Sequence, residues 1–348
     1  MNIALIILAA GKGTRMQSEL PKILHKVAGA PMLVHAMRAG RALEPKRTII
    51  VAGHGFEAVS AAAHTEDPDV EIAVQEAQLG TGHAVDQARD ALGDFDGTVL
   101  VLYGDCPLIQ TRTLEELTAT LNDSAVSVLG FEAKDPARYG RLITDGDKLK
   151  RIVEFKDASP AERAVTLCNS GVMAAPAHLL FDLLSEIDTD NASGELYLTD
   201  VVGKAVARGL QCATVRCAER ETLGVNSRVE LMQAEKEFQN LRRAVALEDG
   251  VSMPAPETVH FSYDTVIGRD TIIEQNVVFG PGVTVESGAQ IRAFSHLEGA
   301  HVSRGCIIGP YARLRPGAEL AEDVKIGNFV EIKASALDEG AKVNHLSY

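Results

Sequence analysis

The chain has 348 residues, 46% of them hydrophobic, and a formal net charge of −14. This length suggests about two domains with sizeable cores. The acidic balance excludes nucleic acid and anionic membranes as preferred partners, because both attract basic surfaces. No apolar run approaches the ~20 residues of a membrane span, and the first run lacks the basic leader and cleavage site of a signal peptide. We therefore expect a soluble, cytoplasmic protein.

A glycine loop follows the first apolar run, Ile3–Leu8. The uninterrupted aliphatic run predicts a parallel strand buried on both faces, and the glycines after it let main-chain N–H groups approach an anion. A dinucleotide fingerprint needs a third glycine where Met16 stands, and a Walker A loop needs Gly-Lys-Ser/Thr after four intervening residues, so both fail on spacing. Lys12, Arg15 and Lys22 add positive charge. The pattern predicts a triphosphate-binding loop; the alternative is a purely structural glycine-rich turn.

Up to about residue 225, buried-strand patterns alternate with amphipathic stretches, which predicts a mostly parallel α/β sheet with helices on both faces. The predicted strands are Ile3–Leu8, Thr48–Val51, Val70–Val74, Thr98–Leu102, Ala125–Leu129 and Gln211–Val215. Ligands of such sheets bind at the carboxyl ends of strands. The glycine loop and the sequence Tyr103-Gly104-Asp105 both fall at such ends.

From residue 227 to about residue 248, apolar side chains recur at alternating spacings of three and four. This spacing predicts one amphipathic helix, whose simplest role is a stiff arm between domains. Two prolines in the next segment end it. We therefore predict an α/β domain at 1–226, a helical linker at 227–250 and a further domain at 251–348.

The last hundred residues have a period of six. Aliphatic or aromatic residues recur at this step from Ile267 to Leu297 and, after a phase break, from Ile308 to Ile332, and small or β-branched residues mostly follow four positions later. A helix cannot keep this period on one face, whereas a solenoid of short sides can. A solenoid needs capped ends, and none is obvious at Tyr348. We expect either a shortened chain or one that associates with other copies.

The two halves together resemble the bifunctional bacterial enzymes that are N-acetylglucosamine-1-phosphate uridylyltransferases and glucosamine-1-phosphate N-acetyltransferases. The resemblance covers essentially the whole chain. Besides the first loop, it rests on Gln75–His83, Tyr103–Leu108, Tyr139–Arg141, Ile152–Lys156, Asn169–Gly171, Gly224–Arg228 and Arg313–Gly317. It implies a Rossmann-like (GT-A-like) nucleotidyltransferase domain, a linker helix and a left-handed parallel β-helix, whose hand departs from the usual crossover rule.

The resemblance implies Mg²⁺-dependent transfer of a uridylyl group from UTP to N-acetylglucosamine 1-phosphate, giving UDP-N-acetylglucosamine for cell-wall and lipopolysaccharide precursors. Arg15 and Lys22 would be catalytic through charge neutralisation, and Asp105 with Asn226 would hold Mg²⁺. The alternatives are a turn-capping carboxylate for Asp105 and a helix N-cap for Asn226.

The other residues that the resemblance implies bind substrate. Leu8, Ala9, Ala10, Gly11, Gln75, Gly80 and Thr81 would hold uridine, Gly140, Glu154 and Asn169 would hold the sugar, and Lys12, Tyr103 and Gly104 would complete the site. Glu154 and Asn169 have an alternative role as ordinary surface polar groups.

For the β-helix, the resemblance implies acetyl transfer from acetyl-CoA to glucosamine 1-phosphate, and a homotrimer. Arg315 and Lys333 match sugar-phosphate contacts, Tyr348 matches a further substrate-binding position, and His345 matches the general base, a task that suits a histidine. His345 is otherwise a frayed residue. Family members continue for several more coils, so we expect little or no acetyl transfer from the chain as given.

Two rival interpretations stay open. Related nucleotidyltransferases with hexapeptide domains act on glucose 1-phosphate, and certain translation-factor exchange subunits use this domain pair without catalysis. The cluster of Arg315, Lys333 and His345 argues against the first, and the loop cations with Asp105 argue against the second.

Overall fold

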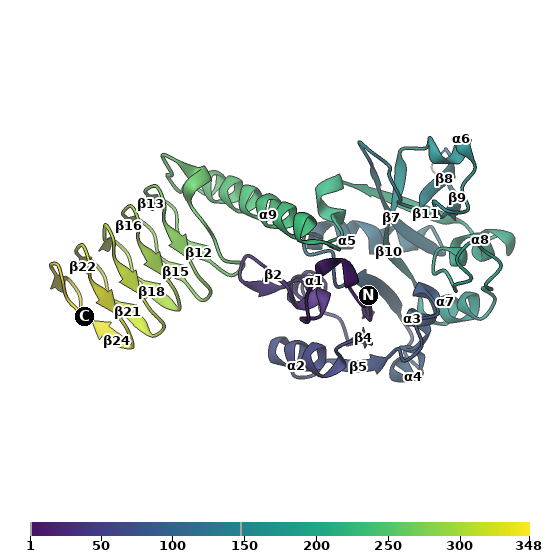
Figure 1. Ribbon diagram of the computed structural model, residues 1–348, viewed down its shortest axis with the longest axis horizontal. Helices are drawn as coiled ribbons and strands as arrows, with labels where there is room; N and C mark the ends of the chain where they lie inside the picture. The colour runs from purple at the N-terminus through teal and green to yellow at the C-terminus, as the bar shows by residue number, and fades with distance from the viewer. Residues whose placement is uncertain (1, 147) are drawn as a thin grey trace. The chain divides into compact units, whose positions relative to one another are not determined.

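A computed structural model describes residues 2–146 and 148–348, and the chain divides into two compact units (Figure 1). Unit 1 comprises Met1–His25 and Pro31–Ala234, and unit 2 comprises Lys26–Ala30 and Glu235–Tyr348. Unit 2 therefore contains a short segment from early in the sequence as well as the C-terminal part. Among the described residues, none of the helices is long and apolar enough to cross a bilayer.

Unit 1 is built on a nine-stranded sheet. Its strands are β1 (Ile3–Ala9), β4 (Arg47–Ala52), β5 (Glu71–Val74), β6 (Thr98–Tyr103), β7 (Val126–Glu132), β8 (Arg141–Asp145), β9 (Lys148–Val153), β10 (Leu167–Pro176) and β11 (Cys212–Cys217). They lie in the order β5-β4-β1-β6-β10-β7-β11-β9-β8. All six strands predicted from the sequence are present.

The sheet is mixed: one half, formed by β5, β4, β1 and β6, is parallel as predicted, whereas the other half combines antiparallel pairs with the parallel pair of β7 and β11. β5, β4, β1 and β6 pair in parallel, whereas β10 runs antiparallel to both β6 and β7, and β8 and β9 form an antiparallel pair. The three strands missed by the sequence reading belong to this second half. β9 has three exposed and three buried residues, and β10 has a register irregularity between Asn169 and Met173, so neither resembles a continuous buried run.

Helices cover both faces of the sheet, as predicted. Alternate residues of β1 enter two different cores: Ile6 packs in one cluster and Ile7 in the other. The helices of unit 1 are α1 (Met32–Arg41), α2 (Phe56–Glu66), α3 (Thr81–Asp86), α4 (Arg89–Leu92), α5 (Thr111–Ala119), α6 (Pro160–Arg163), α7 (Ala177–Leu184) and α8 (Asp200–Ala207). Short 3₁₀ turns occur at η1 (Thr14–Met16), η2 (Lys22–Leu24), η3 (Thr120–Asn122), η4 (Glu219–Thr222) and, in unit 2, η5 (Pro256–Thr258). The predicted arm is α9 (Arg228–Glu248).

The repeats of unit 2 form a parallel β-helix. Its strands are β12 (Val266–Ile267), β13 (Ile272–Ile273), β14 (Val278–Phe279), β15 (Thr284–Val285), β16 (Gln290–Ile291), β17 (His296–Leu297), β18 (Ala300–Val302), β19 (Ile307–Ile308), β20 (Arg313–Leu314), β21 (Ala318–Leu320), β22 (Lys325–Ile326), β23 (Glu331–Ile332), β24 (Ser335–Leu337) and β25 (Lys342–Val343). Every third strand stacks in parallel, which gives three sheets.

The predicted period of six corresponds to the sides of this solenoid. The aliphatic positions end their strands and point into one core, with Phe279, Ile291 and Leu314 fully buried. The phase break after Leu297 is a five-residue step to Val302, and a second five-residue step runs from Ile332 to Leu337; each leaves a coil one residue short of the regular eighteen. The fold therefore confirms the hexapeptide prediction almost residue by residue.

A hairpin of β2 (Lys26–Val27) and β3 (Ala30–Pro31) supplies the early segment of unit 2. Ala28 donates its main-chain N–H to the Glu235 carboxylate at 2.6 Å, and its carbonyl accepts hydrogen bonds from Tyr263 N and Ser262 Oγ. These bonds satisfy both main-chain groups at the hairpin tip. Nothing in the sequence pattern indicated this pairing.

Candidate active site

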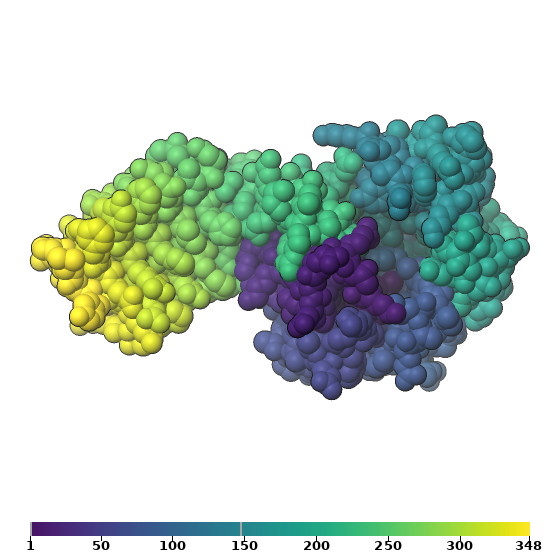
Figure 2. Space-filling model, in the orientation of Figure 1, coloured from purple at the N-terminus to yellow at the C-terminus, as the bar shows by residue number. Residues whose placement is uncertain are grey.

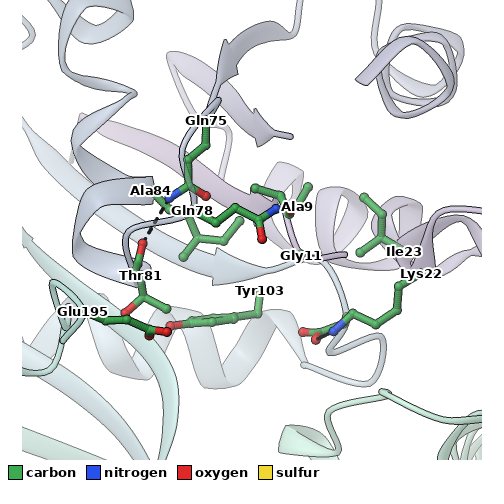
Figure 3. A pocket seen from close by; sticks show the side chains of 14 residues that line it. Ala9, Gly11, Lys22, Ile23, Gln75, Gln78, Thr81, Ala84, Tyr103 and Glu195 are labelled. Carbon is green, nitrogen blue, oxygen red and sulfur yellow. Dashed lines mark hydrogen bonds and ion pairs between the residues drawn. The ribbon is translucent and has the colours of Figure 1, made fainter. Parts of the chain in front are cut away.

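A cavity of about 360 Å³ lies at the carboxyl ends of β1 and β6 (Figure 3). In the space-filling view, purple, blue and teal segments of unit 1 meet around a hollow (Figure 2). Ten predicted residues line the cavity: Leu8, Ala9, Ala10, Gly11, Lys22, Gln75, Gly80, Thr81, Tyr103 and Asp105. Ile23, Gln78, Ala84 and Glu195 complete the lining. The structure thus brings the glycine loop and the Tyr103–Asp105 segment together, as the crevice rule predicts.

The pairing of β1 with β6 positions both sides of this cavity. Leu8 is opposite Tyr103 in the parallel register, and Gly104 donates its N–H to the Leu8 carbonyl at 3.0 Å. The two buried strands therefore release the glycine loop and Asp105 at the same edge. Gly104 lies directly behind the lining and holds the Asp105 turn to β1.

Two glutamine side chains fix the far wall of the cavity. Gln75 is buried and donates its amide to the Gly80 carbonyl at 3.1 Å, while Gln78 donates to the Ala10 carbonyl at 2.7 Å. Because carboxamides both donate and accept, this wall can match the polar edge of a base. The sequence reading missed Gln78, although the residue lies within a motif that it singled out.

Glu195 is a lining residue that the sequence reading also missed. It belongs to the segment that crosses α3: Leu196 exchanges main-chain hydrogen bonds with Leu79 and Gly82, and Leu198 N donates to Thr81 Oγ1 at 3.0 Å. These contacts hold Glu195 beside Tyr103 in Figure 3. The segment has no hydrophobic period, so the sequence carried no signal for this placement.

One ammonium group and two oxygen ligands meet at the end of β6. Lys22 Nζ donates to the Asp105 carboxylate and, at 2.9 Å, to Asn226 Oδ1. The Lys22 and Asp105 side chains are only 11% and 18% exposed. Lys12 and Arg15 are exposed on the loop and do not line the cavity, so their roles stay predictions.

The three predicted sugar contacts lie together. Asn169 N donates to the Gly140 carbonyl at 2.9 Å, and Glu154 lies against Gly140, where it accepts a hydrogen bond from Thr199 Oγ1 at 3.1 Å. Burial raises the pKa of the Glu154 carboxyl above its usual range.

Tyr103 links this group to the cavity. Burial raises the pKa of Tyr103 far above its usual range, and the neighbouring carboxylates of Glu154 and Asp105 raise it further. The phenol therefore stays protonated and able to donate. Its ring packs against Gly171, where any side chain would collide with it.

Arg141, which follows Gly140, is fully buried. Its guanidinium donates to the main-chain carbonyls of Ala137, Tyr139 and Arg163 and so pins the turn that carries Gly140. The motif containing Arg141 was found in the sequence, but this role was not.

The residues predicted for acetyl transfer lie in unit 2 and are only partly assembled. Arg315 Nη1 donates to Glu331 Oε1 at 2.8 Å, and this hydrogen bond, with smaller contributions from the charges of Arg315, Arg313 and Lys333, lowers the pKa of Glu331. Arg315 and Lys333 thus flank one carboxylate, whereas His345 and Tyr348 are exposed.

The family models agree with this division of the chain. Residues 5–183 match the MobA-like NTP transferase domain, and residues 264–299 match the bacterial transferase hexapeptide (six repeats). A solved structure of a UDP-glucose pyrophosphorylase complexed with UDP-glucose superposes with a TM-score of 0.57, covering 70% of this chain and 100% of that one at 17% identity. At this identity the likeness concerns the fold alone.

Two curated relatives match along the entire chain. The bifunctional protein GlmU of Roseobacter denitrificans is 62% identical over 348 residues, which are 100% of this chain and 77% of the relative. The bifunctional protein GlmU of a Ruegeria species is 63% identical over the same span and is covered to 78%.

An NTP transferase domain with its cavity at the strand ends, joined to a hexapeptide β-helix, defines a nucleotidyltransferase with a second, hexapeptide-type transferase domain. The identity to the two relatives then gives the particular family. The chain belongs to the GlmU family.

Proposed function

We propose that unit 1 transfers a uridylyl group from UTP to N-acetylglucosamine 1-phosphate in the presence of Mg²⁺, with release of pyrophosphate. The observation that carries this proposal is the convergence of Lys22, Asp105 and Asn226 at the mouth of an amide-lined cavity. A cation, a carboxylate and an amide oxygen in one place suit the handling of phosphates and a hard metal ion.

The acceptor phosphate is already an anion, so this reaction needs alignment and charge neutralisation rather than a general base. Lys22 reaches the cavity itself, and the exposed cations Lys12 and Arg15 are free to approach a bound triphosphate from the loop. Main-chain N–H groups beside Gly11 add neutral donors to the same phosphates.

The residues at the end of β6 fit Mg²⁺. Asp105 and Asn226 offer two hard oxygen atoms that already converge on one positive charge, the Lys22 ammonium. Within the described residues there is no cluster of three or more His, Cys, Asp or Glu side chains that could cage a metal, which agrees with an ion that keeps water and phosphate ligands. When bound, Mg²⁺ would supply positive charge that neutralises the phosphates.

Specificity for the nucleotide and the sugar follows from two groups of polar side chains near Tyr103. Gln75 and Gln78 hold the wall that we assign to uracil, and Glu154 with Asn169 offers a carboxylate and an amide to the sugar. Polar groups placed to hydrogen-bond a substrate reject analogues that leave them unpaired.

For unit 2 we propose acetyl transfer from acetyl-CoA to glucosamine 1-phosphate. Arg315 and Lys333 flank Glu331 and would exchange this carboxylate for the sugar phosphate. His345, the candidate base, and Tyr348 are exposed, so the described coils should support only weak turnover.

A homotrimer is our proposal for the assembly, and an aromatic column on the β-helix supports association between copies. Phe294, Tyr311 and Phe329 occupy the same corner of successive coils, with ring centroids 4.9 and 5.3 Å apart. Each is about half exposed. A continuous apolar strip of this kind is typical of an interface. Light scattering should give a trimer mass that falls in Tyr311→Ser.

We also propose a cytoplasmic location, because UTP and acetyl-CoA are metabolites of the cytoplasm.

The test is pyrophosphate release with UTP and either N-acetylglucosamine 1-phosphate or glucose 1-phosphate, each with and without Mg²⁺. We expect Mg²⁺-dependent release with the N-acetylated sugar, and a loss of about 10²–10³-fold in Asp105→Asn but not in the exposed control Asp123→Asn. Release with glucose 1-phosphate alone would reassign the substrate, and no release with either sugar would remove the proposal.

A further inference from the structure

The Lys22 ammonium lies on the two oxygen atoms that the proposed function assigns to the metal. It donates to the Asp105 carboxylate and to Asn226 Oδ1, the latter at 2.9 Å, and both charged side chains are largely buried. The ammonium opposes a metal ion on the same oxygen pair, because a monovalent and a divalent charge at such short range repel strongly in a poorly solvated site.

We propose that Lys22 is a placeholder for the metal in the nucleotide-free protein: its ammonium occupies the Asp105–Asn226 oxygen pair and leaves only when a triphosphate draws it away. This inference rests on the proposed function, because it takes the same two oxygen atoms as metal ligands. It adds an order of events, in which the metal site opens together with nucleotide binding.

The two turns that carry these oxygen atoms are tied together independently of Lys22. Val225 N donates to the Asp105 main-chain carbonyl at 2.9 Å, which ties the two ligand-bearing turns together. Asn226 is fixed at its main chain by a 2.7 Å hydrogen bond to the Glu230 carboxylate, and its Nδ2 is directed toward the Gly224 carbonyl. The Asn226 oxygen therefore faces Lys22 because its nitrogen is engaged elsewhere. Only the lysine has to move.

Lys22 is packed against the loop that would receive the triphosphate. A Cβ atom built on Gly13 would lie 2.5 Å from Lys22 Cβ, so the glycine leaves room for the base of this side chain. The lysine stem is flexible, and its three donors can turn from the oxygen pair toward a phosphate without a main-chain shift. A phosphate on the loop then offers Lys22 a replacement for the carboxylate that it gives up.

Removal of the ammonium should therefore uncover the metal site in the free protein. The test uses Mn²⁺ alone, without nucleotide, and follows free Mn²⁺ by electron paramagnetic resonance in the wild-type chain and in Lys22→Met. We expect Lys22→Met to bind one Mn²⁺ ion at least about tenfold more tightly than the wild-type chain. Lys22→Gln provides a second variant, and circular dichroism checks that each variant is folded.

Two further variants test whether the gain in Mn²⁺ affinity comes from the vacated oxygen pair or from the loss of a positive charge in general. Lys12→Met removes one positive charge from the same loop but touches neither Asp105 nor Asn226, so its Mn²⁺ affinity should stay within twofold of the wild type. Lys22→Met combined with Asp105→Asn should lose the gain, because a carboxylate ligand is missing.

Equal affinity in the wild type and in the folded Lys22 variants would overturn the placeholder, as would an equal gain in Lys12→Met. These outcomes do not depend on turnover. Pyrophosphate release by the wild-type chain tests the proposed function separately, so the two can fail independently.

Discussion

The two units of this protein place their important residues in opposite ways. In the β-helix each role is repeated, since Leu297, Leu314 and Ile332 occupy the same side of successive coils. In unit 1 each role is held once, by residues as far apart in sequence as Lys22, Asp105 and Asn226. Core positions that repeat can be predicted from the period of the sequence, whereas a site residue that occurs once can be predicted only from the chemistry of its side chain. The two arrangements should also respond differently to substitution.

The largest expected effect is in the core of the repeats. Leu314→Ala should lower the free energy of unfolding of the β-helix by about 3 kcal/mol, because the fully buried side chain leaves a cavity. Calorimetry should show the earlier transition. Pyrophosphate release should stay within twofold of the wild type. A parallel loss of that activity would show that the two units do not respond independently to substitution.

The next effect concerns the cavity wall in unit 1. Gly80 has φ 121°, and a Cβ atom there would lie 2.4 Å from the Leu196 carbonyl oxygen, so Gly80→Ala must displace the segment that carries Glu195. We expect a loss of about 2 kcal/mol in stability and a rise of about 30-fold in KM for UTP. Thr81→Ser keeps the hydroxyl that accepts from Leu198 and serves as the control, with a change below about threefold.

A smaller effect, of opposite sign on stability and function, is expected at Glu154. Glu154→Gln should raise KM for N-acetylglucosamine 1-phosphate about tenfold, through loss of a charged acceptor. The same variant should be more stable than the wild type at pH 7. The expected rise in KM without a gain in stability would show that burial of the ionised Glu154 carboxylate does not destabilise the folded protein.

The sign of the pH dependence follows from the raised pKa of Glu154 in the folded protein. The folded state then binds more protons than the unfolded state between the two pKa values, so wild-type stability falls as pH rises through that window. The advantage of Glu154→Gln should therefore be absent below the unfolded pKa and grow as pH is raised. Urea unfolding at a series of pH values measures it.

The smallest effect is expected at a corner of the β-helix. Asp270, Gly288, Gly305, Asp323 and Gly340 hold equivalent turn positions with positive φ. The chain already uses two residue types at this corner, and the Asp270 side chain is exposed. Asp270→Gly should change the free energy of unfolding by no more than about 0.5 kcal/mol. A larger change would show that the coils are not interchangeable.

The sequence was sufficient where the pattern is local. The hexapeptide sides, the α9 helix and the six buried strands were all predicted, because each follows from a period or an apolar run of its own residues. β8, β9 and β10 were missed because antiparallel pairing and a half-exposed face remove the continuous run on which the reading relied.

The candidate site was predictable to the extent that it consists of motifs. Most of the residues that line the cavity belong to motifs found in the sequence: the first glycine loop with Lys22, Gln75–His83 and Tyr103–Leu108. The roles of Glu195 and the buried Arg141 could not be predicted, since they depend on hydrogen bonds to main-chain groups rather than on a motif. A main-chain carbonyl can accept a hydrogen bond whatever its residue type, so such contacts produce no recognisable motif in the sequence.

The small hairpin at Ala28 has a consequence for how the protein is made. Its tip emerges from the ribosome early, but Glu235, which accepts its N–H, is synthesised 207 residues later. Until then the Ala28 N–H lacks the carboxylate acceptor that it has in the folded protein. A chain cut after residue 226 would keep the hairpin and lose Glu235, Ser262 and Tyr263, so no single cut separates two complete units.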